Sequence, residues 1–277
     1  MSLRRRIKSL EAHSQLPSPE LRDGSMHCGG DSSWRIGLQE IDGALPDAGL
    51  SRHGVHEIFG ASHADAVAAL GYLLALVKRL QVTSLKTSEA NSPSRSRSPV
   101  LFCQTVKMQR EFGLLHTHGL RAFGFAFNDL MLAHTSKNDD VLWALEEGAR
   151  SGSVRAVIGE VDGISFTQTR RLSLASALTG TPVLLLRPHN DLAASAALSR
   201  WRVRALASGS DPFVPEAPHH ARWQVELSRC RGGRAGKWCV EWDHETHCFS
   251  MAEKLRAGLS EAKNPPRQST QLRQASA

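Results

Sequence analysis

The sequence predicts an α/β fold: a mostly parallel sheet covered by helices, followed by a C-terminal antiparallel extension. Two patterns support this prediction. Between residues 54 and 186, short apolar runs alternate with segments of helical periodicity, as expected for parallel strands that are buried on both faces. From Arg200 onward, consecutive strand-like runs are separated by turn residues, which is typical of antiparallel pairing.

The predicted parallel half begins where Gly54 opens an apolar run. Its expected strands are Gly54–Gly60, Pro99–Gln104, Asp129–His134, Val154–Glu160 and Thr181–Leu186. Its expected helices are Ala64–Leu80, Glu111–Phe123 with glycine breaks, Asn138–Ser151 and Ser165–Leu178. The ends of the last two helices are well marked, because Gly152 and Gly180 follow them.

The predicted antiparallel extension has its strands at Trp201–Leu206, Arg222–Arg229 and Lys237–Trp242. Between the last two strands, the sequence Arg-Gly-Gly-Arg-Ala-Gly at residues 231–236 predicts a hairpin turn. The tryptophans of these strands are interpreted as core residues, and not as groups that stack on nucleic-acid bases.

Three regions are expected along the chain. Residues 1–48 are interpreted as an N-terminal helix and a flexible linker, residues 49–251 as the folded domain, and residues 252–277 as a polar flexible tail. Within the domain, the polar residues 82–98 are expected to form a disordered insertion. In the N-terminal helix, an apolar stripe could dock on a partner or pack on the protein's own core; it consists of Leu3, Ile7 and Leu10.

Composition argues against several classes of protein. The chain of 277 residues has no apolar run long enough to span a membrane, and its basic N-terminus lacks the apolar stretch of a signal peptide. A cytoplasmic location without membrane contact is therefore expected. The five cysteines are scattered and form no C-x-x-C pair, which argues against a disulfide framework, and their spacing to histidines matches no zinc pattern, so no metal is expected.

The segment after the first predicted strand has the order of a phosphate-binding loop: strand, glycine, short loop and helix. If the pattern G-x-x-x-x-G-K-[ST] starts at Gly60, Asp65 stands at the second glycine, Ala66 at the lysine and Val67 at the hydroxyl residue. Alanine and valine can neither neutralise phosphate nor hold magnesium, and a carboxylate at Asp65 would repel phosphate. The sequence therefore predicts a degenerate nucleotide site.

Basic residues gather in the predicted extension. The net charge of +7 favours acidic partners or nucleic acid, although solubility alone explains it equally well. Possible contacts to DNA phosphates or to a partner surround the hairpin: Arg229, Arg231, Arg234 and Lys237. Arg200, Arg202 and Arg204 share one face of a strand, for which a solvated sheet face is the alternative explanation. Any DNA binding is expected to be weak and independent of sequence.

The order of these elements resembles the core of the RecA recombinase. Several segments more closely resemble the ImuA family of RecA-related bacterial proteins. They are residues 54–60 (Gly-Val-His-Glu-Ile-Phe-Gly), 140–147 (Asp-Val-Leu-Trp-Ala-Leu-Glu-Glu), 158–161 (Ile-Gly-Glu-Val), 169–172 (Thr-Arg-Arg-Leu), 194–203 (Ala-Ser-Ala-Ala-Leu-Ser-Arg-Trp-Arg-Val) and 223–234 (Trp-Gln-Val-Glu-Leu-Ser-Arg-Cys-Arg-Gly-Gly-Arg). The resemblance spans residues 52–243, and residues 3–7 also fit it.

This resemblance implies a RecA-like P-loop-type core and a non-catalytic accessory factor in SOS mutagenesis and translesion DNA synthesis. It also implies that the protein bridges a Y-family-like mutagenesis protein and an error-prone replicative-type DNA polymerase, with RecA as a further candidate partner. The DNA-binding loop of RecA looks shortened here to residues 187–191. The alternative among RecA-fold relatives is a SulA-type cell-division inhibitor that binds the division GTPase.

The resemblance also shows which parts of a RecA-type ATPase are missing. Glu160 and Asp162 end the strand where an acid would hold magnesium, and Glu160 is interpreted as a vestige of that acid, with a helix-capping group as the alternative. RecA-type enzymes also need a glutamate that activates water, and it stands after the strand that follows the phosphate-binding loop. Here that strand is Pro99–Gln104, and Gln104 is the nearest polar residue. The chain is therefore predicted not to be an enzyme and to use no cofactor.

Overall fold

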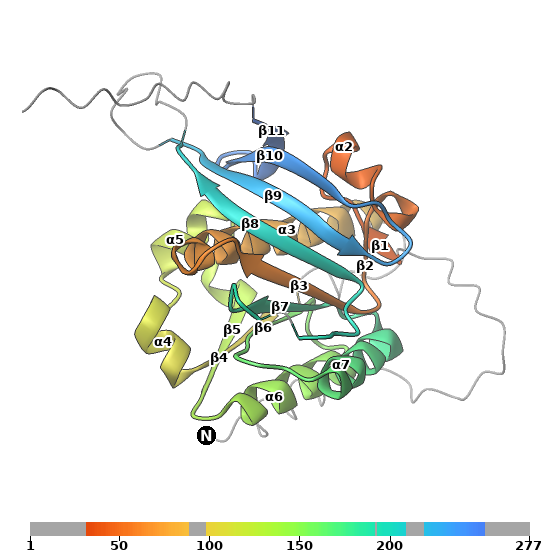
Figure 1. The fold of residues 1–277 in the computed structure, drawn as a ribbon, viewed down its shortest axis with the longest axis vertical. Coiled ribbons are helices and arrows are strands. Elements are labelled where there is room, and N and C mark those ends of the chain that lie inside the picture. Colours follow the sequence, from red (N-terminus) through yellow and green to blue (C-terminus); the bar gives the residue numbers. More distant parts are fainter. Residues whose placement is uncertain (1–31, 89–97, 192, 209–218, 253–277) are drawn as a thin grey trace, which may run out of the picture.

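The computed structural model describes residues 32–88, 98–191, 193–208 and 219–252 of the chain. A nine-stranded sheet forms its centre (Figure 1). The strands of the parallel half are β3 (Val55–Gly60), β4 (Val100–Thr105), β5 (Leu130–Thr135), β6 (Val157–Glu160) and β7 (Val183–Arg187). Those of the extension are β8 (Ser199–Leu206), β9 (Ala221–Cys230), β10 (Gly236–Asp243) and β11 (Cys248–Met251). Their order across the sheet is β11-β10-β9-β8-β3-β7-β6-β4-β5.

Strand β8 joins the two halves, because it pairs parallel to β3 on one side and antiparallel to β9 on the other. The predicted fold class is confirmed at this level: an α/β protein with a large, mostly parallel sheet, compatible with a RecA-like core. Strand β11 was not predicted. It has only four residues, of which Phe249 alone is buried, so the strand carries little sequence signal.

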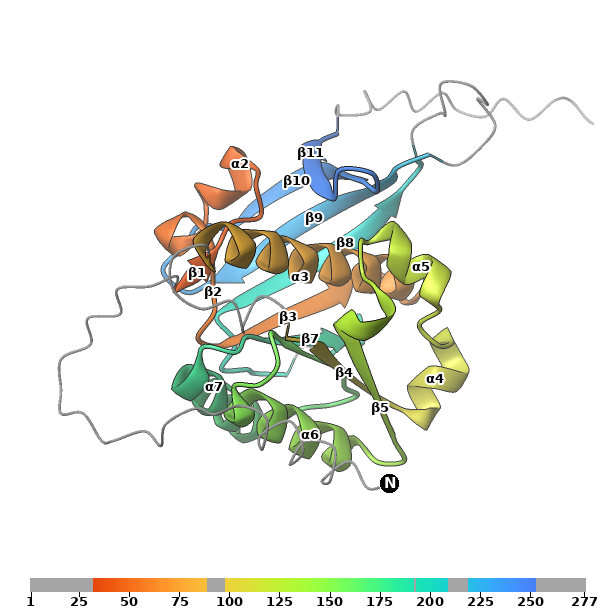
Figure 2. The same cartoon turned by 180° about the vertical axis from the view of Figure 1, so that it is seen from behind.

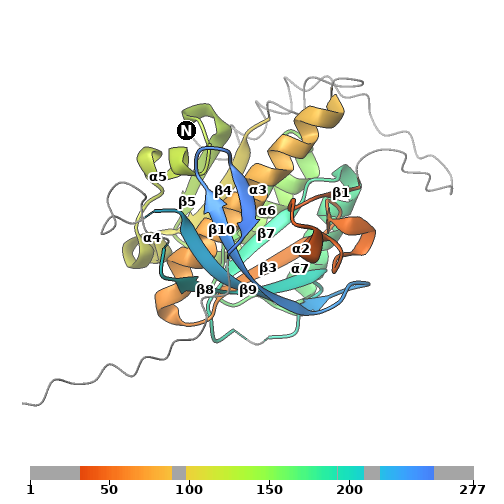
Figure 3. The same cartoon turned by 90° about the horizontal axis from the view of Figure 1, so that it is seen from above.

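Three long helices cover the two faces of the sheet. Helix α3 (Ala66–Ser88) packs on one face, where Leu73 and Leu76 join Ile58 and Leu184 in one apolar cluster (Figure 2). Helices α6 (Asn138–Ser151) and α7 (Phe166–Thr179) pack on the other face, and their side chains form a second cluster with Val55. Viewed from above, β8 and β9 cross over α3 (Figure 3).

Two predicted helix boundaries were wrong. The helix expected over residues 111–123 is split into α4 (Val106–Phe112) and α5 (Thr117–Ala122), because Gly113 adopts a φ of 89° that ends α4. Helix α3 continues to Ser88, so the first part of the expected insertion at residues 82–98 is helical. No glycine or proline interrupts the chain there. Residues 89–97 lie outside the described part.

The boundary expected at residue 48 was also wrong, because residues 33–48 belong to the folded domain. They form β1 (Ser33–Trp34), which pairs with β2 (Leu50–Ser51), then α2 (Gln39–Asp42) and a 3₁₀ turn (Pro46–Ala48). The Trp34 ring is fully buried, and its Nε1 donates a hydrogen bond to the Leu76 carbonyl at 3.2 Å. The Asp42 carboxylate closes the segment by accepting bonds from the amides of Ile36 and Gly37.

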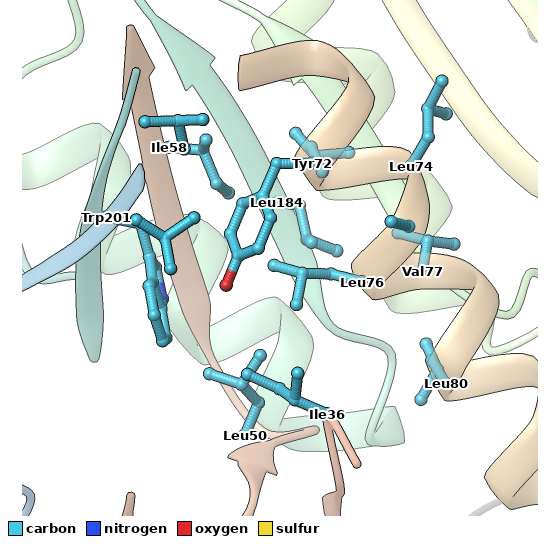
Figure 4. Close-up of a cluster of buried hydrophobic side chains, with 14 of the residues drawn as sticks. Ile36, Leu50, Ile58, Tyr72, Leu74, Leu76, Val77, Leu80, Leu184 and Trp201 are labelled. Atoms are coloured by element: carbon cyan, nitrogen blue, oxygen red, sulfur yellow. The ribbon is translucent and has the colours of Figure 1, made fainter. Parts of the chain in front are cut away.

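The main core lies between this segment, α3 and the sheet (Figure 4). Ile36 and Leu50 of the N-terminal segment lie beside Tyr72 and Leu76 of α3 and Trp201 of β8. Burying a side chain of this size contributes about 1.5–3 kcal/mol, so the segment adds substantially to stability. Among the tryptophans predicted to be core residues, the ones buried in the described structure are Trp201, Trp223 and Trp242.

Candidate functional site

The loop after β3 lies at the carboxyl edge of the parallel strands, where open α/β sheets bind ligands. Gly60 ends β3, a 3₁₀ turn spans His63–Asp65, and α3 starts at Ala66. The loop folds back closely over its own glycine, since a Cβ on Gly60 would lie 2.7 Å from the Ser62 carbonyl oxygen. A side chain at this position would therefore displace the loop.

The Asp65 carboxylate is bound within the fold. It accepts a hydrogen bond from the Ser62 hydroxyl at 2.7 Å and another from the Ala205 amide, at the end of β8, at 2.9 Å. Burial alone would raise the pKa of this carboxyl, but these hydrogen bonds and the nearby Arg204 guanidinium hold the pKa below its usual value. Asp65 therefore fastens the loop to the antiparallel extension, a role that the sequence did not reveal.

Helix α3 begins without a side chain that could bind a phosphate. The side chain of Ala66, its first residue, has no polar atom, and Val67 is 61% exposed. A nucleotide site at this loop is not established by the geometry, and its description as a degenerate site stays a prediction.

Glu160 ends β6 and is 1% exposed. Its Oε2 accepts a hydrogen bond from Nε2 of Gln104 at 2.7 Å. Burial raises the pKa of the Glu160 carboxyl, and the bond from Gln104 offsets only part of that rise. The structure thus brings together the two residues that the sequence placed at the magnesium and water-activating positions. They contact each other, and the Gln104 Oε1 has no hydrogen-bond partner in the described part of the chain.

A cavity of about 220 Å³ opens beside this loop, at the ends of β3, β6 and β7. Its charged groups are mostly paired with one another. Lys107 contacts Asp162 at 2.9 Å, and His63 lies 3.7 Å from Glu111 and edge-on to the His189 ring. Apart from Asp162, these residues were not predicted as site residues, because they come from segments far apart in the sequence: His63 from the 3₁₀ turn, Lys107 and Glu111 from α4, and His189 from the chain after β7. The pairing leaves few free charges to attract a phosphate.

A buried group of charges lies on the α7 side of the same strands; we call it the charge network. It consists of Glu57, Arg187, Asp191 and Arg200. The Glu57 carboxylate accepts hydrogen bonds from the guanidinium of Arg187 and, at 3.0 Å, from Arg200, and Arg187 also contacts Asp191 at 2.5 Å. The side chains of Glu57 and Arg187 are fully buried. Because each charge has an opposite partner, the network is suited to holding β3, β7 and β8 together.

One signal for this network is present in the sequence. Glu57 is a carboxylate within an otherwise apolar buried strand, and a buried acid needs a cation nearby. Both guanidinium groups also lie over the Phe59 ring, at 5.4 Å for Arg187 and 5.2 Å for Arg200.

The predicted hairpin between β9 and β10 is confirmed, and hydrogen bonds hold it against neighbouring segments. The Arg234 amide and guanidinium donate to the carbonyls of Ala44 and Gly43, at 2.8 and 3.0 Å. Arg229 reaches the Ser195 carbonyl at 3.4 Å, and Lys237 lies 4.0 Å from Glu226. The hairpin is thus fastened to the folded N-terminal segment, although all four of its basic residues are exposed. Their contact to DNA or a partner stays a prediction.

Other predicted sites fall outside the described residues or have no counterpart within them. Leu3, Ile7 and Leu10 lie outside the described part. In that part, no group of three or more His, Cys, Asp or Glu side chains is arranged to hold a metal ion. A search for spanning segments in the same residues finds no helix with the length and apolar character needed to cross a membrane.

The fold and the strand-end geometry define an α/β protein with a mostly parallel sheet, compatible with a RecA-like core. No profile of a known protein family matches the chain. Protein ImuA from two strains of Caulobacter vibrioides is 29% identical over 262 residues, a match that covers 89% of this chain and 94% of that protein. This similarity supports assignment to the ImuA family, as the sequence resemblance predicted, and nothing found here supports the SulA-type alternative.

Proposed function

We propose that this protein is a non-catalytic accessory factor in DNA-damage-induced mutagenesis and translesion DNA synthesis. The observation that carries the proposal is the similarity to Protein ImuA over nearly the whole length of both chains. A shared fold alone would not favour a shared role. A shared role is favoured here because the match covers most of both chains and is not confined to one motif or one half of the sheet.

The strand-end geometry supports the absence of catalysis. The residues that hold a triphosphate and magnesium in a P-loop are replaced by Asp65, Ala66 and Val67, and Asp65 is already bound to Ser62 and to β8. Glu160 is buried against Gln104, and its Oε2 is already engaged by the Gln104 amide at 2.7 Å.

In this proposal the protein acts by bridging. Its partners are a Y-family-like mutagenesis protein and an error-prone replicative-type polymerase, with RecA as a third candidate. A tagged chain, recovered from cells after DNA damage, should bring down these proteins, and deletion of its gene should lower damage-induced mutation frequency. Recovery of the division GTPase without any polymerase would instead favour the SulA-type role.

The proposed absence of catalysis has its own test. The purified protein should hydrolyse no ATP above background, with or without DNA. The triple exchange Asp65→Gly, Ala66→Lys and Val67→Thr should not restore hydrolysis, because β4 ends in Gln104 and Thr105, without a glutamate to activate water. Turnover by the wild type that disappears in Glu160→Gln would contradict the absence of catalysis without touching the bridging role.

A further inference from the structure

One side of β8, β9 and β10 has no described helix over it (Figure 1). Alternation along the strands sends Trp201, Trp223 and Trp242 into the core against α3. The opposite side carries long polar side chains. We call its four basic residues the basic face: Arg202 and Arg204 of β8, Arg222 of β9 and Lys237 of β10.

The basic face has more positive charge than its own acids can neutralise. Arg222 is paired with Glu241, and Lys237 lies 4.0 Å from Glu226, which also stands opposite Arg202 in the strand register. Arg204 stands opposite the neutral Gln224. No described side chain forms an ion pair with Arg202 or Arg204. Asp65 lies near enough to Arg204 for the guanidinium to lower its pKa, but Asp65 is 8% exposed and held by its own hydrogen bonds.

The hairpin adds positive charge beside the basic face, but it is not the centre of the unpaired charge. Arg234 and Arg229 already donate to backbone carbonyls of neighbouring segments, whereas Arg231 is exposed and makes no described side-chain contact. Arg202 and Arg204 are therefore the two guanidinium groups of the basic face that no described ion pair neutralises. They stand two residues apart on a strand, which separates them by about 6.7 Å, a spacing of the same order as that of successive phosphates along a nucleic acid strand.

The face also lacks what single-strand binding requires. Proteins that bind single strands stack bases on aromatic side chains, but the tryptophans of β8–β10 pack on the α3 side and Phe59 of β3 is only 2% exposed. A duplex keeps its bases stacked inside and offers only phosphates to a flat basic surface. We infer that the basic face binds the phosphate backbone of duplex DNA, independently of sequence, with Arg202 and Arg204 as the central contacts.

Three variants that each remove two positive charges test this inference. The first is Arg202→Gln with Arg204→Gln, the second is Arg231→Gln with Arg234→Gln in the hairpin, and the third is Arg110→Gln with Lys137→Gln. Arg110 and Lys137 are exposed and lie after β4 and β5, at the far edge of the sheet from β9 and β10. Binding to a short labelled duplex is followed by fluorescence anisotropy between about 50 and 200 mM salt.

The exchange at Arg202 and Arg204 should weaken binding and reduce the slope of log affinity against log salt by about 1.8, since each phosphate contact contributes about 0.9. The hairpin variant should reduce the slope by less, and the Arg110/Lys137 variant should match the wild type. Thermal melting checks that each variant folds. If the variant with both exchanges, at Arg202 and Arg204, does not fold, Arg204→Gln alone is used instead. Arg204 is exposed, and its exchange should reduce the salt slope by about half as much.

The DNA measurements would overturn the inference if they showed no wild-type binding at the lowest salt, equal losses in all three variants, a larger loss in the hairpin variant, or tighter binding to a single strand. Equal competition by polyglutamate would assign the face to an acidic protein, which also overturns it. The inference does not depend on the proposed bridging role. A protein that fails to recover polymerases can still show the predicted salt slope on DNA. A protein that recovers polymerases can also fail to bind DNA.

Discussion

The charge network around Glu57 and the basic face of β8–β10 lie on the same side of one sheet, yet they use arginine in opposite ways. In the charge network, the Arg187 side chain is fully buried and contacts two carboxylates. On the basic face, Arg202 and Arg204 have no ion pair in the described structure. Arg200 stands between the two groups, two residues before Arg202 on β8, and belongs to the network because it reaches Glu57.

This difference shows how position along a strand decides what a charge does. Near the centre of the sheet, helices and neighbouring strands exclude water, so each charge needs a partner to offset its desolvation. Toward the extension no described helix covers this side, and water solvates the guanidinium groups. Substitutions in the network should therefore change stability, and substitutions on the face should change binding.

The largest effect is expected for Glu57→Gln. Removing the carboxylate leaves two guanidinium groups without their shared partner, one of them fully buried, and breaking a buried pair in this way costs about 3–5 kcal/mol. Urea denaturation should show this as a lower midpoint. Glu245→Gln, at an exposed position without an ion pair, is the matched control and should stay within about 0.5 kcal/mol of wild type. A Glu57→Gln protein as stable as this control would contradict a structural role for the network.

A smaller loss, about 1–3 kcal/mol, is expected for Asp65→Ala, because the Ala205 amide and the Ser62 hydroxyl would lose their acceptor. Since folding lowers the pKa of Asp65, its contribution is present above the unfolded pKa of about 3.9 and is lost as the pH falls through the folded value. The difference between wild type and variant should therefore shrink in acid. A difference that grew as the pH fell would exclude this explanation.

Glu160→Gln should act in the opposite direction and more weakly. Folding raises the pKa of Glu160, so the wild type loses stability as the pH rises from the unfolded pKa of about 4.3 through the folded value. A neutral glutamine removes this cost and keeps an acceptor for Gln104. The variant should melt slightly higher than wild type at pH 7, and the two should converge near pH 4. A variant that melts lower at pH 7 would show that the charge of Glu160 is needed.

The smallest change in stability is expected on the basic face. Arg202→Gln with Arg204→Gln should leave the free energy of unfolding within about 0.5 kcal/mol per site, because neither side chain has an ion pair to lose in the described structure. The same urea experiment checks this, with the Glu57→Gln protein as the unstable reference. A loss comparable to that of Glu57→Gln would erase the distinction between network and face.

Much of this architecture could be predicted from the sequence, because the buried strands have a recognisable pattern. The parallel strands were found because they are buried on both faces and appear as short apolar runs, such as Val-Leu-Leu-Leu at residues 183–186. The folded segment at residues 33–48 was missed because its apolar residues, including Trp34 and Ile36, are separated by polar residues, glycine and proline. Such a pattern resembles a linker until tertiary packing is known.

The charge network could not be assembled from the sequence, because its contacts depend on strand register. Glu57 meets Arg187 across 130 residues and Arg200 across 143. The Asp65 contact to the Ala205 amide has the same origin, since it requires β8 to lie beside β3. By contrast, the proximity of Gln104 and Glu160 was implied once both were placed at the ends of adjacent strands, because β4 pairs with β6.

The strand order also has a consequence for how the chain folds during synthesis. Strand β3 is the first strand of the large sheet to leave the ribosome, yet it pairs only with β7 and β8, which are made much later. Until β7 has emerged, both edges of this apolar strand lack their native partners, and the second edge stays open until β8 follows; such edges are prone to mispairing. Closure of so long a loop also slows folding. The centre of the sheet therefore assembles late, when most of the chain already exists.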